Sequence, residues 1–130
     1  MIDPLPQTPP FRFVDRLLEQ DPPHRCVTLK VFSAGEALLE GGGSVPASLV
    51  LEALCQSAAF LPGSPDPAGG RIVRIDEAEL AGEVRPGDRL VVTSRLLEET
   101  AEALVAECRG EVDGMAVARL RVLIRRNAQS

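Results

Sequence analysis

The chain has 130 residues, of which 45% are hydrophobic and 25% are charged. This length and balance fit one globular domain and exclude a disordered chain. The net charge of −5 argues against nucleic-acid binding, which needs a basic surface. No apolar run reaches the roughly 18 residues that span a bilayer. We expect one domain over 1–130, in the cytoplasm because the first residues do not resemble a signal peptide.

The first part of the chain predicts an extended lead-in and then a β-hairpin. Prolines within 1–10 prevent a helix or a central strand there. A strand-like pattern begins at Phe11, and residues 21–24 (DPPH) have the composition of a turn. Residues 25–32 then alternate as a strand does. Four residues share one face of that strand: Cys26, Thr28, Lys30 and Phe32.

Residues 46–61 (PASLVLEALCQSAAFL) predict one long helix after a loop over 34–45. The segment contains no glycine and no internal proline. Pro46 suits the first helical turn, and we expect Ser44 or a neighbour to cap the helix. Because the segment is apolar nearly all the way round, we expect burial on every side. The helix should end before Pro62.

The chain after residue 70 predicts antiparallel strands. Four strand-like segments follow one another: 71–80, 89–97, 104–112 and 115–124. Residues 85–88 (RPGD) and 113–114 (DG) have the composition of tight turns. Residues 125–130 are expected to form a loose tail. The order of hairpin, helix and strands indicates an α+β fold with a curved sheet around the helix. A second copy would close the side that the sheet leaves open, which favours a dimer.

Cysteines and arginines suggest no separate chemistry. The three cysteines lie far apart among apolar neighbours, so we expect buried free thiols and no metal site. They are Cys26, Cys55 and Cys108. Arginines gather within 71–89 and 119–126. These stretches fit either a solvated strand face or a patch for an acidic partner.

Three polar residues interrupt the apolar helix at intervals of four: Ser48, Glu52 and Gln56. This spacing places them on one face of the helix. A carboxylate in an apolar helix is costly unless it is hydrogen-bonded or faces a cavity. Two interpretations follow. Either the polar neighbours simply satisfy Glu52, or the stripe lines a pocket in which desolvation raises the pKa of Glu52.

Five segments resemble, in order, motifs of the bacterial 3-hydroxyacyl-acyl-carrier-protein dehydratases. The helical segment 49–58 (LVLEALCQSA) resembles the family's V/I-E-A-L-A-Q-A motif. The other four are listed in chain order: 5–16 resembles the opening L-P-H-R-x-P-F-L-L-V-D-R, 74–78 the strand G-I-D-x-A, 84–90 the turn V-x-P-G-D-x-L, and 112–114 a late hairpin. Together they make the resemblance specific, although each alone would be weak.

This resemblance implies a hot-dog fold that binds thioesters of acyl carrier protein or CoA, without a cofactor. It assigns the catalytic carboxylate to Glu52, which helps the β-hydroxyl leave as water. Backbone N–H groups near Ala47 and Ser48 would polarise the thioester oxygen, and Gln56 joins them as a substrate-binding residue. In the resembled dimers the pocket lies between subunits, so we expect a homodimer or a higher oligomer.

The chain departs from the family at the catalytic histidine. The family's G-H-F-P-G loop corresponds to residues 39–46 (LEGGGSVP), which contain no histidine, and Gln7 replaces the histidine of the opening motif. His24, the one histidine, lies in a predicted surface turn. Cys55 could replace the base, but a thiol among apolar groups is usually inert. Loss of a general base costs a factor of about 10² to 10⁴ in rate.

Three functions are compatible with the sequence. The chain binds 3-hydroxyacyl or enoyl thioesters, either with weak dehydratase activity or with a histidine supplied by a paralogue in a heterodimer. Alternatively, it is a hot-dog thioesterase in which Glu52 activates water or attacks the carbonyl. In the third, it holds an acyl chain without catalysing a reaction. Product analysis separates them, because hydrolysis releases a free thiol and dehydration produces an enoyl thioester.

Overall fold

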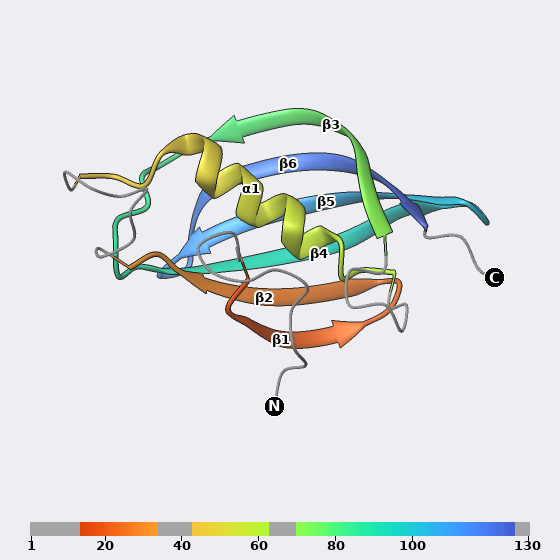
Figure 1. Cartoon of the computed structure of the whole chain (residues 1–130), viewed down its shortest axis with the longest axis horizontal. Coiled ribbons are helices and arrows are strands. Elements are labelled where there is room, and N and C mark those ends of the chain that lie inside the picture. The colour runs from red at the N-terminus through yellow and green to blue at the C-terminus, as the bar shows by residue number, and fades with distance from the viewer. Residues whose placement is uncertain (1–13, 34–42, 63–69, 127–130) are drawn as a thin grey trace.

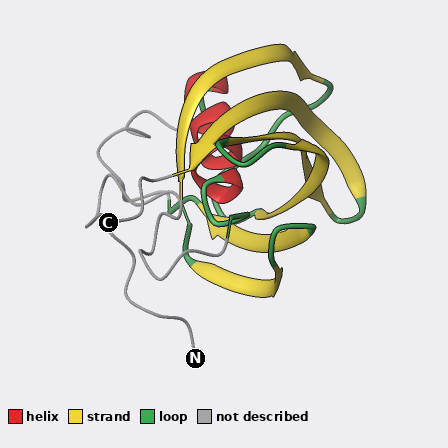
Figure 2. Cartoon of the chain, turned by 90° about the vertical axis from the view of Figure 1, so that its right-hand side faces the viewer, coloured by secondary structure: helices red, strands yellow, loops and turns green. Residues whose placement is uncertain are grey.

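The computed structural model describes residues 14–33, 43–62 and 70–126. They form one helix and six strands, in this order: β1 (Arg16–Asp21), β2 (Arg25–Val31), α1 (Ala47–Ala58), β3 (Gly70–Leu80), β4 (Arg89–Glu99), β5 (Ala103–Val112) and β6 (Met115–Arg126). The strands make one antiparallel sheet in the order β1-β2-β4-β5-β6-β3. The sheet curls around α1, as Figures 1 and 2 show. The predicted α+β hot-dog architecture is confirmed.

The predicted ends of the elements need correction. The helix ends at Ala58, three residues before Leu61, and the chain closes with tighter turns in which Phe60 N donates to Ser57 O at 3.2 Å. β6 continues to Arg126 because it pairs with the start of β3. The predicted loose tail is therefore wrong for residues 125–126. The lead-in over 1–10 and most of the predicted loop over 34–45 lie outside the described residues.

Two of the predicted turns have the backbone that their sequences require. In the turn over 85–88, Gly87 has a φ of 93° and Asp88 N donates to Arg85 O at 3.0 Å. Asp113 and Gly114, between β5 and β6, have φ values of 53° and 80°. Two positive φ values in succession are what a two-residue hairpin turn needs.

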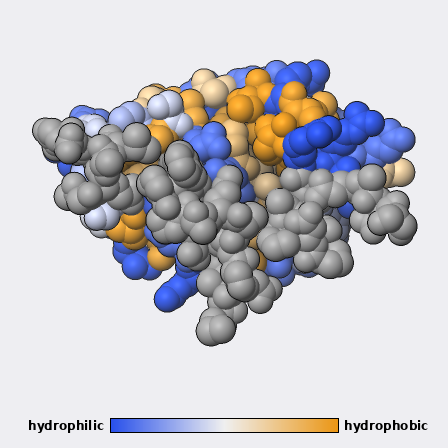
Figure 3. All heavy atoms as spheres, in the orientation of Figure 1, coloured by the Kyte–Doolittle hydropathy of each residue, from blue (hydrophilic) through white to orange (hydrophobic). Residues whose placement is uncertain are grey.

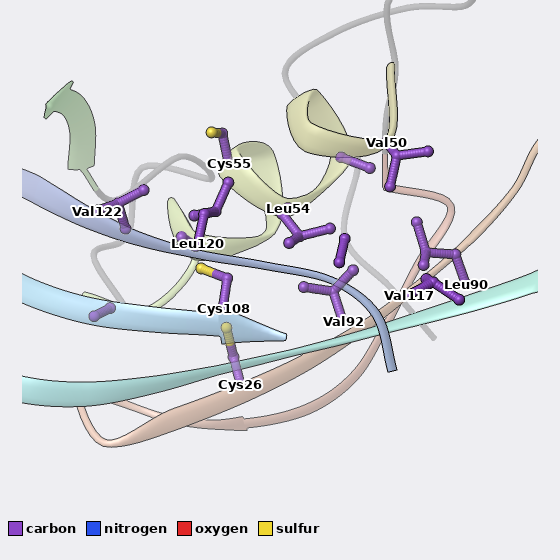
Figure 4. Packing of buried hydrophobic residues seen from close by; sticks show 14 of the residues in the cluster. Cys26, Val50, Leu54, Cys55, Leu90, Val92, Cys108, Val117, Leu120 and Val122 are labelled. Atoms are coloured by element: carbon purple, nitrogen blue, oxygen red, sulfur yellow. The ribbon is translucent and has the colours of Figure 1, made fainter. Parts of the chain in front are cut away.

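The core lies between one face of α1 and the inner face of the sheet. Val50 and Leu54 of the helix pack over the strands, as Figure 4 shows. The fully buried sheet residues beneath them are Cys26, Leu90, Val92, Leu104, Ala106, Cys108, Leu120, Val122 and Ile124. Gly110 of β5 permits the close approach: a Cβ there would lie 3.2 Å from Leu54 Cδ1 and 3.1 Å from Leu90 Cδ1. Burial of this apolar surface is the main source of stability.

The opposite face of α1 is open in the single chain. Ala47, Ser48 and Glu52 are exposed, and Leu51 is half-buried. The prediction that the helix is buried on every side is therefore wrong for one chain, because a single sheet curls around one side. No helix in the described ranges is long and apolar enough to cross a membrane.

Candidate functional site

The start of α1 directs backbone donors toward solvent. Pro46 is the N-cap, and in the part of the chain that the structure describes no side chain caps the helix. Ser44 instead donates to Glu83 Oε1, so the predicted Ser44 cap is wrong. The N–H groups of Ala47 and Ser48 precede the first intrahelical bond, in which Leu49 N donates to Pro46 O at 3.0 Å. They lie at the positive end of the helix dipole, where an anion or a polarised carbonyl oxygen is stabilised.

The proline–glycine turn after β3 holds the start of the helix in place. Val45, which is buried, donates its N–H to Val84 O at 2.7 Å. Gly87 N then donates to Phe32 O at 2.8 Å, which ties the same turn to the end of β2. The backbone just before Ala47 is thus fixed by contacts with segments distant in sequence.

The predicted polar stripe exists on the open face of α1. Gln56 Nε2 donates to Glu52 Oε2 at 3.1 Å, and Ser48 lies one turn before Glu52. Gln56 is half-buried, whereas Glu52 and Ser48 are exposed. Glu52 is exposed in the single chain because none of the strands in the described residues covers this face of the helix. The four predicted site residues are nevertheless brought together along one side of α1.

The opposite side of the helix is anchored by a buried hydroxyl pair that the sequence analysis missed. Thr28 Oγ1 lies 2.5 Å from Ser57 Oγ, and Ser57 Oγ donates to Ala53 O at 2.7 Å. The thiol of Cys26 donates to Ser57 O at 3.5 Å. Because Ser57 immediately follows Gln56, this contact fixes the rotation of α1 and points the polar stripe away from β2. The available signal was a serine on the apolar side of the helix.

Neither Cys55, the possible substitute base, nor His24, the one histidine of the sequence, is placed to remove a proton. Burial, followed by the charge of Glu52, raises the pKa of the Cys55 thiol to about 11. It is therefore protonated at neutral pH. His24 lies in the turn between β1 and β2, exposed, where its carbonyl accepts a hydrogen bond from Leu96 N at 2.9 Å. That turn joins the sheet, whereas Glu52 lies on the helix face that the sheet leaves open.

All three cysteines are buried free thiols, as predicted. Burial raises the pKa of both Cys26 and Cys108 to about 12. These two project from the sheet, and Cys55 is carried by the helix (Figure 4). In the described residues, no group of three or more histidine, cysteine, aspartate or glutamate side chains is arranged to hold a metal ion.

Lys30 is a buried cation of β2 to which the sequence analysis gave no role. Its side chain is 8% exposed, and Nζ lies 3.6 Å from Asp15 Oδ1 and 5.0 Å from the centroid of the Phe32 ring. Asp15 also accepts from Val31 N at 2.7 Å. The pair attaches the segment before β1 to β2. A lysine among alternating apolar residues was the signal for this contact.

The arginine stretches lie largely on the outer face of the sheet, among acids. Three ion pairs there are Arg74–Asp76 at 3.0 Å, Arg119–Glu79 at 3.0 Å and Arg121–Glu77 at 3.7 Å. One hollow on this face is lined by charges of both signs, among them Glu79, Glu107, Arg109 and Arg119. Mixed charges favour a solvated strand face over a patch for an acidic partner.

Comparisons with known proteins agree with this fold. No family model matches the chain. A curated relative, the 3-hydroxyacyl-[acyl-carrier-protein] dehydratase FabZ of Streptococcus pyogenes, is 33% identical over 121 residues, which cover 88% of this chain and 86% of the relative.

Solved structures share the fold at much lower sequence identity. The dehydratase heterocomplex ApeI:P from Xenorhabdus doucetiae matches with a TM-score of 0.76 and 14% identity, over 96% of this chain and 89% of that one. A hypothetical thioesterase with coenzyme A from Streptococcus pneumoniae matches with a TM-score of 0.71 and 10% identity, over 88% and 86%. A dehydratase heterocomplex and a hypothetical thioesterase therefore share this architecture.

Proposed function

The chain belongs to the 3-hydroxyacyl-[acyl-carrier-protein] dehydratase family, and on this premise we propose that it binds 3-hydroxyacyl or enoyl thioesters of acyl carrier protein or CoA along the open face of α1. The observation that carries the proposal is the position of Glu52. Its carboxylate is hydrogen-bonded to Gln56 and exposed, in a helix whose other side is closed by the core.

The start of the helix supplies the second part of the proposed site. The N–H groups of Ala47 and Ser48 would donate hydrogen bonds to the thioester oxygen, because no side chain of the described residues caps the helix and they lie at the positive end of its dipole. Glu52 lies one turn after Ser48, about 6 Å along the axis. An acyl chain that runs along α1 would thus place its β-carbon near the carboxylate.

Dehydration of such a substrate needs two proton transfers. Glu52, when protonated, would donate a proton to the β-hydroxyl, which leaves as water, while a base takes the proton from the α-carbon. Cys55 is a poor base because burial keeps its thiol protonated. Without a replacement for the family's histidine, we expect dehydration slower by a factor of about 10² to 10⁴.

A second subunit would complete the site by covering the open face of the helix. We propose a homodimer as the basic unit. A mixed dimer, in which a histidine-bearing paralogue supplies the base, is the alternative that would restore fast dehydration. The heterocomplex of dehydratases on the same fold is the precedent for that alternative.

The test measures binding and turnover with matched variants. Purified protein is incubated with 3-hydroxyacyl and enoyl thioesters, and enoyl absorbance and free-thiol release are recorded separately. We expect thioester binding and slow interconversion, with interconversion abolished in Glu52→Gln. The control is Glu98→Gln, which removes the charge of an exposed residue on β4 and should change nothing.

Other outcomes identify other functions. Thiol release that depends on Glu52 would show a thioesterase and overturn the dehydratase assignment. Binding without either product would show a non-catalytic acyl-binding protein. Failure to bind any thioester, by a protein with a cooperative unfolding transition, would contradict the proposal as a whole.

A further inference from the structure

Lys30 of β2 is a charged residue at a core position, with Asp15 as its ion-pair partner. Its side chain is 8% exposed, and Nζ lies 3.6 Å from Asp15 Oδ1 and 5.0 Å from the centroid of the Phe32 ring. Burial of a cation costs free energy, and an apolar side chain of similar volume is often equally stable in such a place. The pair is therefore better explained by the geometry that it sets than by the stability that it adds.

Asp15 continues the sheet where β1 has ended. The pairing of β1 with β2 reaches as far as Arg16, which lies opposite Leu29. One residue earlier, Asp15 N donates to Leu29 O at 2.8 Å, and Asp15 Oδ2 accepts from Val31 N at 2.7 Å. The carboxylate thus takes the place of a strand carbonyl beside the end of β2. Because its other oxygen faces Lys30, the ion pair holds the carboxylate on the Val31 N–H group.

The end of β2 that this carboxylate supports is bonded to the turn over 85–88. Val31 lies opposite Arg89, the first residue of β4. Phe32 is fully buried, and its carbonyl oxygen accepts from Gly87 N at 2.8 Å. Two further hydrogen bonds close the turn itself. The position of the turn is therefore set by the end of β2.

The same turn holds the start of α1. Val84 immediately precedes the turn, and its carbonyl oxygen accepts from Val45 N at 2.7 Å. Both valines are buried, and Ala47 follows two residues after Val45. Figure 1 shows the start of α1, the end of β2 and this turn at the same end of the molecule, on the left. A continuous series of contacts therefore joins Lys30 to the N–H groups of Ala47 and Ser48.

We propose that Asp15 and Lys30 are positioning residues for the proposed reaction. By holding the end of β2, they fix the turn over 85–88 and thereby the N–H groups at the start of α1. The inference rests on the proposed function, in which these N–H groups polarise the thioester oxygen. Neither side chain is a catalytic group, since both act through the backbone. A misplacement of about 1 Å lowers a rate by about a hundredfold, so an ion pair away from the substrate affects turnover.

Lys30→Met tests this inference, with Arg25→Met as the matched control. Lys30→Met keeps a long side chain at a core position but leaves Asp15 without its cation. Arg25 forms an ion pair with Glu19 at the other end of the same two strands, so its replacement changes the net charge equally. Asp15→Asn is the second variant. It keeps an acceptor for Val31 N–H, and because the Asp15 side chain is 40% exposed, it should fold even if Lys30→Met does not.

These variants leave the apolar patch on β3 unchanged. Figure 3 shows this patch at the upper right, where Figure 1 draws the first half of β3. The substitutions lie on β2 or just before β1, and these strands are at the opposite edge of the sheet from β3. A change in self-association through the patch is therefore not expected to disturb the comparison.

Amide hydrogen exchange measures the series of contacts without any ligand. In Lys30→Met we expect the amides of Val45 and Gly87 to exchange at least about tenfold faster than in the wild type, because the hydrogen bonds of both depend on the end of β2. Asp15→Asn should have a smaller effect in the same direction. Arg25→Met should leave both exchange rates unchanged.

Two functional measurements separate positioning from stability. The probe is an enoyl thioester of CoA with an isotope label at the thioester carbonyl. Infrared spectroscopy should show the carbonyl band at lower wavenumber when the probe is bound to the wild type, and closer to its free position in Lys30→Met. The second measurement is the rate of interconversion. We expect kcat to fall by about tenfold to hundredfold in Lys30→Met, with KM changed by less than about twofold.

Three results would overturn the inference. The first is unchanged exchange of the Val45 and Gly87 amides in Lys30→Met. The second is a variant that loses stability in denaturant but keeps the wild-type carbonyl band and kcat, which would show a purely structural role. The third is an equal effect of Arg25→Met. A wild type that binds no thioester would overturn the proposed function as well, whereas binding with an unaffected carbonyl band in Lys30→Met would overturn this inference alone.

Discussion

The two sides of α1 differ in their burial and in the hydrogen bonds that they make. Toward the sheet, Leu54 is fully buried and Ser57 shares hydrogen bonds with Thr28 and the helix backbone. Toward the open side, Glu52 is exposed and accepts a hydrogen bond from Gln56, four residues along the same helix. The buried side therefore determines stability and the orientation of the helix. The open side is free to carry chemistry, because changes there cost little folding free energy.

Removal of a core side chain should have the largest effect on stability. We expect Leu54→Ala to lower the free energy of unfolding by about 2 to 5 kcal/mol, because it leaves a cavity between α1 and Gly110. Leu51→Ala, at a half-buried position, should cost clearly less. Denaturant titration measures both. Equal losses would contradict the contrast between the two sides.

Alkaline pH should have the next largest effect, because ionisation of the buried thiols lowers the free energy of unfolding. Burial raises the pKa of the thiols to about 12 for Cys26 and Cys108 and about 11 for Cys55, from an ordinary value near 9. Unfolded thiols lose protons near pH 9 while folded thiols keep them. Their stabilising contribution is therefore complete below pH 9 and disappears as pH rises toward 11 to 12. By pH 10 we expect a loss of about 1 kcal/mol for each thiol.

This pH effect can be isolated because the chain has no tyrosine and Lys30 is its single lysine. Unfolding in denaturant at pH 8 and pH 10, with reductant present, gives the difference. A variant with Cys108→Ala should lose less stability over this range than the wild type. A free energy of unfolding that does not change with pH would show that the thiols are not buried as described.

Disruption of the buried hydroxyl pair between Thr28 and Ser57 should have the smallest of these effects on the free energy of unfolding. Ser57→Ala leaves the Thr28 hydroxyl buried without its partner, which we expect to cost about 1 to 2 kcal/mol. The double variant Thr28→Val/Ser57→Ala removes both hydroxyls and should cost little more than Ser57→Ala alone. A double-mutant cycle measures the coupling. Additive losses would mean that the two side chains do not stabilise each other.

Local patterns predicted much of the site. Ser48, Glu52 and Gln56 lie on one face because a spacing of four is one helical turn, and the structure confirms the Gln56–Glu52 contact. Glu52 is exposed in the single chain, because an apolar composition does not say which side of a helix the sheet covers. The Ser44 cap was wrong for a similar reason. Its acceptor, Glu83, is 39 residues away.

The sequence by itself determined the element types, the turns and the polar stripe, because each depends on residues within a few positions of one another. Only the tertiary structure decided which side of α1 is closed and which strands lie at the edges. Strand order depends on long-range pairing, and here β3 pairs with β6 rather than with its neighbour in sequence, β4. That pairing places β3 at an edge of the sheet, next to β6.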